Sequence, residues 1–403
     1  MKACRACGSA QVNSFFSLGN MPLANALLAH PQLDMEEPRY PLDLSFCQEC
    51  YLIQLDQIVA PEKLFSEYLY FSSFSTDMVH HACAIANRLV IERNLTSDSL
   101  IVEIASNDGY LLQWYQKSDI PVLGIEPAQN IAKVAQDEKN IPTRVEFFGV
   151  DLAQKLNREG KQADIIHANN VMAHVPDING FVQGIRLILK PEGMAVIEVP
   201  YAVDMIERGE FDTIYHEHVY YFSVTALDKL FKKHDLIIKQ VERISIHGGS
   251  LRLFVTPITS AAQQEDSVLN LLDSEKQMRQ QWQLDLKVKQ LQVELVSKLR
   301  DLKKAGKTIA AYGASAKGST LLNYFGIGRE IIEYVVDRSI YKQGKYMPGV
   351  LIPILPPSAL SERQPDYVLL LTWNFAAEIL AQQSEYRTRG GRFIVPLPQL
   401  YEV

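Results

Sequence analysis

Apolar runs alternate with amphipathic stretches along two parts of the chain. Short apolar runs separated by helical patterns are typical of βαβ units, in which helices cover both faces of a parallel sheet. The runs lie at residues 100–104, 122–126, 163–169 and 194–199 in the first part, and at 308–312, 333–337 and 367–371 in the second. The pattern therefore predicts an α/β protein with a doubly wound sheet, followed by a second α/β domain.

The stretch between these two parts is strongly helical. It runs from about Ala262 to Lys304 without Gly or Pro, and its apolar residues from Leu284 to Leu302 recur at steps of three and four. Such spacing places them on one face of a helix. We interpret the stretch as one long helix that joins two α/β domains. A coiled-coil helix that forms a dimer is the alternative.

The composition is that of a globular protein. The 403 residues suffice for two or three domains, and 40 basic against 47 acidic side chains give a net charge of −7. Nucleic-acid binding needs a basic face, so this charge argues against it. No apolar run approaches the roughly 20 residues of a membrane-spanning helix, and the start lacks the apolar segment of a signal peptide. We therefore expect a soluble, cytoplasmic protein.

Four of the five cysteines form two Cys-x-x-Cys pairs, Cys4 with Cys7 and Cys47 with Cys50. Such pairs can supply the four thiolates that tetrahedral Zn²⁺ prefers, each pair on a tight turn. The segment between the pairs is longer than in a compact zinc ribbon. A thioredoxin-like dithiol is the alternative, but it needs a strand before the motif, and only three residues precede Cys4. We expect structural zinc at these thiolates and a packed Cys83.

The first two apolar runs carry a nucleoside-binding pattern. Glu103 lies in the first run, a turn of small residues ends at Gly109, and Glu126 closes the second run. The turn lets the backbone approach a ligand, and the second carboxylate can accept hydrogen bonds from both ribose hydroxyls. Because the turn keeps a single glycine, it leaves little room for a pyrophosphate, which favours a nucleoside such as S-adenosylmethionine. The alternative is that both glutamates merely end strands.

Further cofactor contacts are expected at later strand ends. Asp151 follows the third strand, where an acid often contacts the adenine amino group, and Asn169 and Asn170 close the fourth. The residues predicted to bind S-adenosylmethionine are therefore Glu103, Ala105, Ser106, Asn107, Gly109, Glu126, Asp151, Asn169 and Asn170.

Two segments are rich in groups that transfer protons. Residues 167–177 include His174 and lie at the carboxyl end of a strand, where open α/β sheets bind ligands; residues 215–223 hold two histidines, a glutamate and three tyrosines. Histidine suits a general base, and Tyr215 can donate to a developing oxyanion. Glu217 can hold the histidine tautomer or pass on the proton. A metal bound by His216 and His218, or structural hydrogen bonding alone, are the alternatives.

The second α/β domain begins with a strand, a small-residue turn and a helix start at residues 310–319, which include Ser315 and Lys317. N–H groups at a helix start together with a lysine favour an anion, so we expect this relict Rossmann domain to bind a diphosphate. Residues 247–252 end in Arg252, which suits a second phosphate contact. The alternatives are a purely structural domain and a plain hairpin turn.

Four motifs occur together: the cysteine pairs, Glu-Ile-Ala-Ser-Asn-Asp-Gly at 103–109, Tyr-His-Glu-His at 215–218 and Tyr-Gly-Ala-Ser-Ala-Lys-Gly at 312–318. In this order they resemble the sugar C-methyltransferases that act on nucleotide-linked 4-keto-deoxysugars, of the tetronitrose C-3 methyltransferase type. The resemblance covers essentially the whole chain. It implies a zinc-binding domain that lids the site, a class I domain that holds S-adenosylmethionine, and a Rossmann-like domain that helps to hold the sugar nucleotide. We place these domains at 1–72, 73–260 and 306–403, with the linking helix at 261–305.

The resemblance also implies residue roles. His218 corresponds to the base, with Glu217 and Tyr215 beside it, and His174 to a second active-site histidine. The active-site tyrosine corresponds to Tyr68 or Tyr70, and we favour Tyr70. The catalytic residues predicted are His218, Glu217, Tyr215, His174 and Tyr70, and the substrate contacts predicted are Tyr68, Arg252, Lys317 and Ser315.

Methylation of a carbon beside a ketone explains why a base and hydrogen-bond donors occur together in this sequence. A carbon beside a ketone becomes a nucleophile only after its proton leaves, and the negative charge then lies on the ketone oxygen. We predict that His218 removes the C-3 proton with help from Glu217, that Tyr215 or His174 hydrogen-bonds to the enolate, and that the enolate attacks the S-methyl group.

Two other function classes remain as alternatives. An O- or N-methyltransferase shares the cofactor site but does not need Tyr215, Glu217 and His218 together. A zinc-ribbon regulatory or nucleic-acid-binding protein predicts basic residues around the cysteine pairs, where acidic residues lie instead. We expect a nucleotide sugar as the partner, no nucleic acid or membrane, and a monomer or homodimer.

Overall fold

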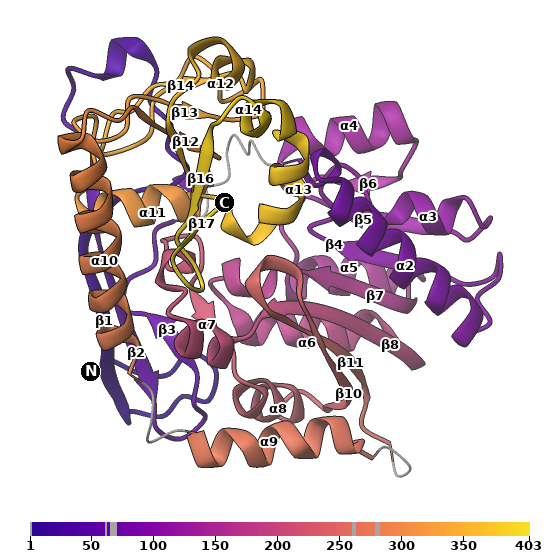
Figure 1. Ribbon diagram of the computed structural model, residues 1–403. Helices are drawn as coiled ribbons and strands as arrows, with labels where there is room; N and C mark the ends of the chain where they lie inside the picture. The colour runs from indigo at the N-terminus through magenta and orange to yellow at the C-terminus, as the bar shows by residue number, and fades with distance from the viewer. Residues whose placement is uncertain (1, 61–62, 65–70, 260–262, 279–282) are drawn as a thin grey trace.

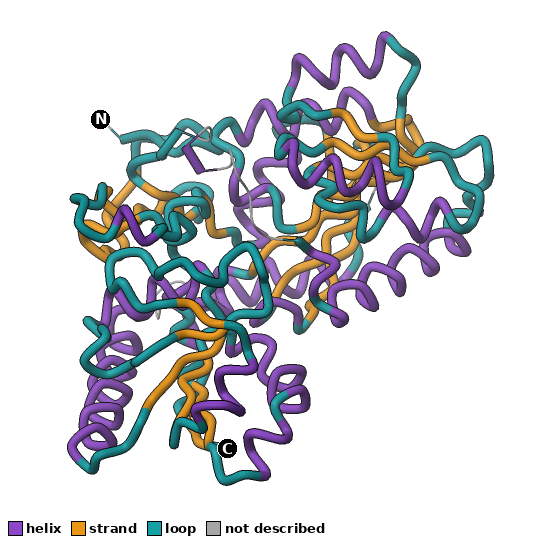
Figure 2. The backbone as a smooth tube through the Cα atoms, turned by 90° about the horizontal axis from the view of Figure 1, so that it is seen from above, coloured by secondary structure: helices purple, strands orange, loops and turns teal. Residues whose placement is uncertain are grey.

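The computed structural model describes residues 2–60, 63–64, 71–259, 263–278 and 283–403 (Figure 1). Within these residues the chain forms a four-stranded, a seven-stranded and a six-stranded sheet. Seen from above, helices flank the strands of the two larger sheets (Figure 2). The α/β class predicted from the alternating pattern is confirmed.

The seven-stranded sheet is the doubly wound one. Its order is β10 (Leu236–Ile244), β11 (Ser250–Pro257), β8 (Leu189–Pro200), β7 (Ala163–Asn169), β4 (Ile101–Ile104), β5 (Val122–Ile125) and β6 (Thr143–Arg144). The five strands from β8 to β6 run parallel, and β11 runs antiparallel to both β8 and β10. Every residue of β4 is buried, as expected for a strand with helices on both faces.

Helices form a separate core on each face of this sheet. The helices on one face are α2 (Thr76–Glu92), α3 (Leu112–Gln116) and α4 (Gln129–Lys139), and those on the other are α5 (Val150–Arg158), α6 (Ile178–Ile188) and α8 (Val224–Lys232). The strand order reverses at β4, which lies between β5 and β7. The loops that leave such a switch point diverge and open a crevice at the carboxyl ends of the strands, where ligands bind.

The N-terminal sheet is antiparallel and includes a strand from far along the chain. It contains β1 (Val12–Pro22), β2 (Arg39–Cys47), β3 (Ile53–Leu55) and β9 (Tyr220–Tyr221). β9 directly follows the Tyr-His-Glu-His motif, and its residues pair with Ile53 and Gln54 of β3. The motif is therefore attached to the N-terminal sheet, which the sequence did not indicate.

The C-terminal sheet is parallel except for its last strand. Its order is β14 (Ile354–Leu355), β13 (Val335–Val336), β12 (Ile309–Tyr312), β15 (Tyr367–Leu370), β16 (Arg392–Val395) and β17 (Tyr401–Glu402). Its helices are α11 (Ala316–Phe325), α12 (Ser358–Arg363), α13 (Ala376–Gln382) and α14 (Ser384–Thr388). This is the Rossmann-like arrangement that the second series of apolar runs predicted. α7 (Ala202–Arg208), which follows β8, packs into the same core.

The prediction of one long linking helix is wrong. The structure has two helices, α9 (Asp266–Met278) and α10 (Leu284–Lys304), which run in different directions (Figure 1). Gln283 before α10 has a non-helical backbone, with φ −128° and ψ 56°. The apolar face of α10 is buried against the C-terminal core, with Leu295 and Leu299 fully buried, so the stripe packs within the chain rather than in a coiled coil. The domain boundaries at residues 72, 260 and 305 stay a prediction.

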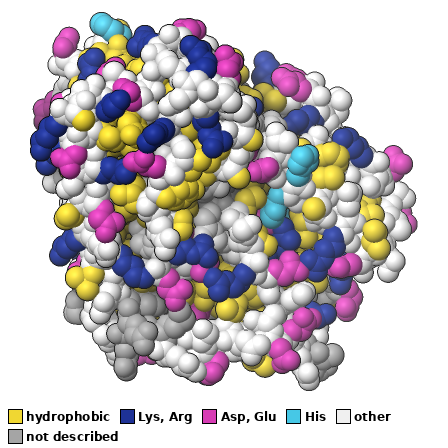
Figure 3. Space-filling view, in the orientation of Figure 1, with side chains coloured by type: hydrophobic (Ala, Val, Ile, Leu, Met, Phe, Trp, Pro, Cys, Tyr) yellow, Lys and Arg dark blue, Asp and Glu magenta, His cyan; other side chains and the backbone are white. Residues whose placement is uncertain are grey.

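On the face drawn in Figure 3, Lys and Arg side chains are interspersed with Asp and Glu side chains. Among the described residues, none of the helices combines the length and apolarity that crossing a membrane requires.

Candidate functional site

The loop after β4 turns tightly at the switch point. Ala105, Asn107 and Gly109 have φ angles of 55°, 49° and 74°. A left-handed conformation costs a non-glycine residue roughly 1–2 kcal/mol, and such strain clusters at functional sites. Gly109 is also required by space, because a Cβ there would lie 2.9 Å from Ile141 Cγ1. The predicted small-residue turn is thus a strained loop over the carboxyl end of the sheet.

Two buried carboxylates flank this loop. Glu103 comes from β4 and Glu126 follows β5. Glu126 accepts hydrogen bonds from the N–H groups of Asn107 (3.0 Å) and Ala128 (2.9 Å). Burial raises the pKa of Glu126 to about 7, and burial together with the nearby Asp108 carboxylate raises the pKa of Glu103 well above its usual range. Glu126 is therefore held by two backbone segments at the place where a carboxylate can accept ribose hydroxyls.

Other predicted cofactor residues surround the same edge of the sheet. The side-chain oxygens of Asn169 and Asn170 are buried and have no hydrogen-bond partner among the described residues, so both are acceptors that suit a ligand. Asp151 is exposed in the first turn of α5. The sequence reasoning missed Phe147, which is 55% exposed in the loop before α5. Its signal was an aromatic residue after the third strand, and an exposed aromatic ring can stack on adenine.

His218, the predicted base, is oriented by two contacts. His218 Nδ1 lies 2.8 Å from the carbonyl oxygen of Thr213, and His218 Nε2 lies 2.8 Å from the hydroxyl of Tyr215. A carbonyl oxygen can only accept, so the neutral ring carries its proton on Nδ1 and leaves Nε2 unprotonated. Thr213 ends a short 3-10 helix (Phe211–Thr213) just before the motif. The structure therefore gives the tautomer-holding role predicted for Glu217 to a backbone carbonyl.

Glu217 points to the N-terminal domain. Its Oε1 accepts a hydrogen bond of 2.7 Å from the side-chain amide of Asn25. Burial raises its pKa to about 7, while Asn25 and the positive charge of Lys342 oppose the rise. A carboxyl group with a pKa near neutrality suits proton transfer.

His174 lies beside His218. It ends a 3-10 helix (Met172–His174) after β7, and its ring centre is 4.8 Å from that of His218 in an edge-on arrangement. Burial lowers the pKa of His174 to about 4, so its ring is neutral at pH 7. The structure thus brings Tyr215, His218 and His174 together, as predicted.

The alternative of a metal bound by His216 and His218 is not supported. His216 contacts Tyr40 instead, with Nε2 3.2 Å from the carbonyl oxygen of Tyr40 and its ring edge-on to the Tyr40 ring. Across the described parts of the chain, the four paired cysteines are the group of potential ligands that lies close enough to hold a metal ion. Tyr68 and Tyr70 lie outside the described residues, so their roles stay predictions.

The predicted substrate residues of the C-terminal turn have different surroundings. The hydroxyl of Ser315 caps α11 by accepting from the N–H of Gly318 (3.1 Å). Lys317 Nζ lies 4.5 Å from the centre of the Trp373 ring and has no hydrogen-bond partner among the described residues. Its positive charge opposes the burial that raises the pKa of Asp212 and that of Glu210, the latter to about 8. The ammonium of Lys317 is therefore buried beside Trp373, and its charge acts on the carboxyl groups of Asp212 and Glu210.

Arg252 lies in a different environment from the one predicted. Its guanidinium pairs with Glu198 (2.8 Å) and Glu242 (3.2 Å) and lies 3.0 Å from His81 Nε2. The register of β11 against β8 sets Arg252 opposite Glu198 and buries it in this cluster. This position argues against the phosphate contact, and residues 246–249 form the turn of a β10–β11 hairpin, which was the alternative.

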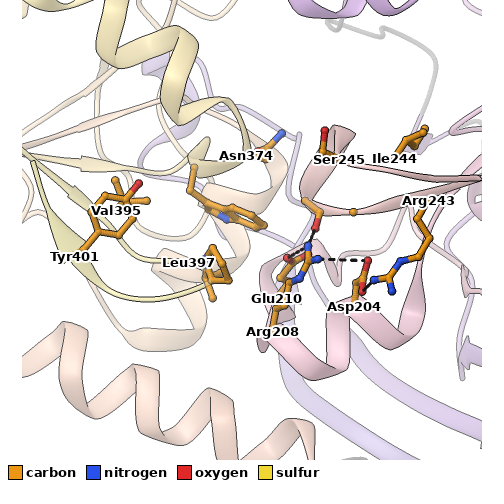
Figure 4. Close-up of a pocket in the computed structure, with 14 residues that line it drawn as sticks. Asp204, Arg208, Glu210, Arg243, Ile244, Ser245, Asn374, Val395, Leu397 and Tyr401 are labelled. Carbon is orange, nitrogen blue, oxygen red and sulfur yellow. Dashed lines mark hydrogen bonds and ion pairs between the residues drawn. The ribbon is translucent and has the colours of Figure 1, made fainter. Parts of the chain in front are cut away.

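A cavity of about 450 Å³ lies between the seven-stranded sheet and the C-terminal domain (Figure 4). The first domain contributes Arg208 and Arg243, which both pair with Asp204, and the second contributes Trp373 and Tyr401. The indole N–H of Trp373 donates to Asp212 (2.7 Å). The cavity therefore combines aromatic walls with two guanidinium groups, next to the ammonium of Lys317.

The four paired cysteines form one cluster. Their sulfur atoms all lie within 4.8 Å of one another, with 3.4 Å between Cys4 and Cys50 and 3.6 Å between Cys7 and Cys47. Tetrahedral zinc with Zn–S bonds of about 2.3 Å requires sulfur separations of this order. Three of the four side chains are buried, and Gly8 with φ 82° lets the chain turn after Cys7. The residues fit a structural zinc site with no open position for a substrate.

Comparisons with known proteins agree with this geometry. Family models match at residues 4–65 (putative zinc binding domain), 77–241 (methyltransferase domain) and 245–398 (C-methyltransferase C-terminal domain). The C-methyltransferase NovU of Streptomyces niveus is 34% identical over 401 residues, which cover 98% of this chain and 95% of NovU. The chain belongs to this C-methyltransferase family.

Shorter or more distant matches include two methyltransferases and one further solved structure. A ubiquinone biosynthesis O-methyltransferase of Bartonella tribocorum is 28% identical over 24% of this chain and 39% of its own. The solved structure of magnesium protoporphyrin IX methyltransferase from Synechocystis PCC 6803 with bound S-adenosylmethionine has a TM-score of 0.35 and 12% identity, covering 45% of this chain and 79% of its own. The PH0226 protein from Pyrococcus horikoshii OT3 has a TM-score of 0.39 and 14% identity, covering 50% of this chain and all of its own.

The C-methyltransferase therefore has the two cofactors expected from its sequence. S-adenosylmethionine serves its middle domain, whose doubly wound sheet carries the strained loop and Glu126. Zinc binds to its N-terminal domain, where the four thiolates lie close together.

Replacement of one thiolate tests the zinc site. We expect Cys4→Ser to lower the zinc content from about one ion per chain toward zero and to lower the melting temperature, because structural zinc contributes directly to folding. Metal analysis and thermal denaturation measure both effects. Cys83→Ser, at a cysteine outside the cluster, is the matched control. Unchanged zinc in Cys4→Ser would contradict the four-thiolate site.

Replacement of Glu126 tests the cofactor site. A hydrogen bond to a charged group contributes about 1.5–3 kcal/mol, so we expect Glu126→Gln to weaken S-adenosylmethionine binding roughly tenfold or more. The ionised carboxylate, which prevails above its pKa of about 7, is the better acceptor for two hydroxyls. Calorimetry should therefore show that the affinity of the wild type for S-adenosylmethionine rises from pH 6 to pH 8. The affinity of Glu126→Gln should depend less on pH.

The control for this measurement is Glu138→Gln, on the exposed side of α4. It should bind like the wild type at every pH. If Glu126→Gln also did so, Glu126 would not contact the ribose.

Proposed function

We propose that this enzyme transfers a methyl group from S-adenosylmethionine to C-3 of a nucleotide-linked 4-keto-deoxysugar, with a dTDP sugar as substrate. The observation that best supports the proposal is the orientation of His218: Thr213 holds its Nδ1 proton, and Nε2 faces the Tyr215 hydroxyl. A base with a donor beside it is what removal of a proton next to a ketone requires. The motif resemblance supports the dTDP sugar and the C-3 position.

Each residue has a separate role in the proposed reaction. Bound S-adenosylmethionine supplies an electrophilic methyl group on sulfur. His218 Nε2 takes the C-3 proton, and the electron pair of the broken C–H bond moves onto the ketone oxygen. Tyr215 and the neutral ring of His174, which both lie beside His218, hydrogen-bond to that oxygen. C-3 then forms its bond to the methyl carbon, and Glu217 accepts the proton that His218 must lose before the next cycle.

The cavity between the domains supports a substrate that binds through its nucleotide part. Trp373 and Tyr401 offer aromatic surfaces for a base, and Lys317 offers an unpaired ammonium for a diphosphate. Cations and N–H groups at a helix start attract phosphate groups, and α11 begins next to Lys317.

The nature of the product is the first test. Incubation with methyl-labelled S-adenosylmethionine and a dTDP-4-keto-6-deoxysugar should yield a product with an acid-stable C-methyl group at C-3, assigned by NMR. A methyl group on a different carbon would show that the assignment to C-3 is wrong. A methyl ether would contradict C-alkylation and favour O-methylation.

Proton exchange tests the base separately from methyl transfer. In D₂O without methyl donor, the wild type should exchange the C-3 proton, and His218→Ala should exchange it roughly 10²–10⁴-fold more slowly, which is the usual contribution of general base catalysis. His80→Ala, at an exposed histidine on α2, should behave like the wild type. Full exchange by His218→Ala would show that another group is the base.

A further inference from the structure

One loop of the zinc-binding domain crosses to the C-terminal domain. After β1 ends at Pro22, the backbone of Leu28 exchanges two hydrogen bonds with that of Tyr346, at 3.0 and 2.9 Å. Further along, the carboxylate of Glu37 accepts the N–H of Gly349 at 2.7 Å. The loop from residue 23 to residue 37 is thus pinned to the C-terminal domain at two points.

Asn25 lies in this pinned loop and reaches the catalytic motif. Its amide nitrogen donates to Glu217 Oε1 at 2.7 Å. Glu217 is 4% exposed, so the hydrogen bond is shielded from water. The nearby main-chain bonds between Ala26 and Leu23 (3.1 Å) and between Leu27 and Asn25 (2.9 Å) keep the loop tightly turned at this position.

The other groups that face Glu217 come from three directions. Lys342, in the same C-terminal segment as Tyr346, donates to the carbonyl oxygen of Ala314 (2.8 Å), lies 3.6 Å from Asp337, and acts on Glu217 through its charge. The ring of His174 faces the backbone of Glu217 from the cofactor domain. The motif itself adds the sequence neighbours His216 and His218, but the ring of the first contacts Tyr40 and that of the second contacts Thr213 and Tyr215 instead. Among these, Asn25 is the group that the structure shows bonded to the carboxylate.

We propose that Asn25 is a positioning residue for the reaction: its amide fixes the Glu217 carboxylate and favours the ionised form, so that the zinc-binding domain takes part in proton transfer at the active site. The inference rests on the proposed function, in which ionised Glu217 takes the proton from His218. Asn25 itself need not touch the substrate.

The inference predicts a measurable change in the pKa of Glu217. Burial raises the pKa of this carboxyl group to about 7, and the Asn25 amide holds it down because it stabilises the anion. Loss of the amide donor should move the pKa upward by about one pH unit, since a hydrogen bond to a charged group contributes that much. The ionised form is then lost at a higher pH, so activity falls on the acid side and recovers on the alkaline side.

The test uses the full chain with zinc bound and two variants of Asn25. Asn25→Asp keeps the shape and replaces the donor by a second carboxylate, and Asn25→Ala removes the donor. Asn20→Ala, at an exposed asparagine of β1, is the control. Zinc content and melting temperature are measured for each protein, so that Asn25→Asp alone suffices if Asn25→Ala folds poorly.

The first readout needs no turnover. Infrared difference titration of wild type against Glu217→Gln reports the protonation of Glu217, and its midpoint should rise by about one pH unit in Asn25→Ala and by more in Asn25→Asp. The second readout is kcat against pH with the dTDP-4-keto-sugar. Asn25→Ala should lose about tenfold in kcat at pH 6 and little at pH 9, and Asn25→Asp should lose more than about tenfold at pH 6, with KM for S-adenosylmethionine unchanged in both. Added to Glu217→Gln, Asn25→Ala should cause no further loss.

The outcomes separate the two proposals. An unchanged Glu217 titration midpoint in both Asn25 variants would overturn the role of Asn25, even if the wild type methylates the keto-sugar. A raised midpoint together with a wild-type enzyme that leaves the keto-sugar unmethylated would keep Asn25 as the residue that sets the charge of Glu217 and would refute the proposed substrate. A loss of kcat that is equal at every pH would show a structural role only, and would also overturn the inference.

Discussion

The peptide backbone of Val219 joins the three parts on which the active site depends. Its N–H donates to the carbonyl oxygen of Ala173 at 2.7 Å, and its carbonyl oxygen accepts from the N–H of Leu55 at 2.9 Å. The first bond sets the segment of His174 beside that of His218. The second continues into the pairing of β9 with β3, which begins shortly after the second cysteine turn. The segment of His218 is therefore bonded both to the segment of His174 and to the strand that follows the second cysteine turn.

The active-site region keeps several carboxyl groups away from water. Glu126, Glu210 and Glu217 are almost fully buried, and burial raises the pKa of each toward or above neutrality. Burying an ionisable group costs stability unless it is paired, so a fold shaped by stability alone would replace these residues. Groups with such raised pKa values are typical of sites that bind or react. Bound ligands that supply hydroxyl groups or positive charge would offset the free-energy cost of burying these carboxyl groups.

The sequence predicted the repeating elements well because their signals are local. Apolar runs predicted four strands of the seven-stranded sheet and three of the six-stranded sheet, and the cysteine spacing predicted the zinc site. Long-range pairings were not predictable in this way. The hydrogen bond between Asn25 and Glu217 spans 192 residues, and neither residue type reveals its partner. Arg252 looked free to bind phosphate because its partner Glu198 is set by strand register, which a single sequence does not show. The break between α9 and α10 carries neither Gly nor Pro.

The protonation states of the cluster favour carbon over oxygen as the methyl acceptor. His174 stays neutral at pH 7 because its pKa is lowered to about 4, whereas the Glu217 pKa is raised to about 7, close to the working pH. Two neighbouring groups whose pKa values are moved in opposite directions can take different roles in acid–base chemistry. A hydroxyl acceptor requires removal of one proton only. An enolate requires a base at the carbon, a donor at the oxygen and a group that takes up the proton. In the proposed reaction His218, His174 with Tyr215, and Glu217 fill these three roles.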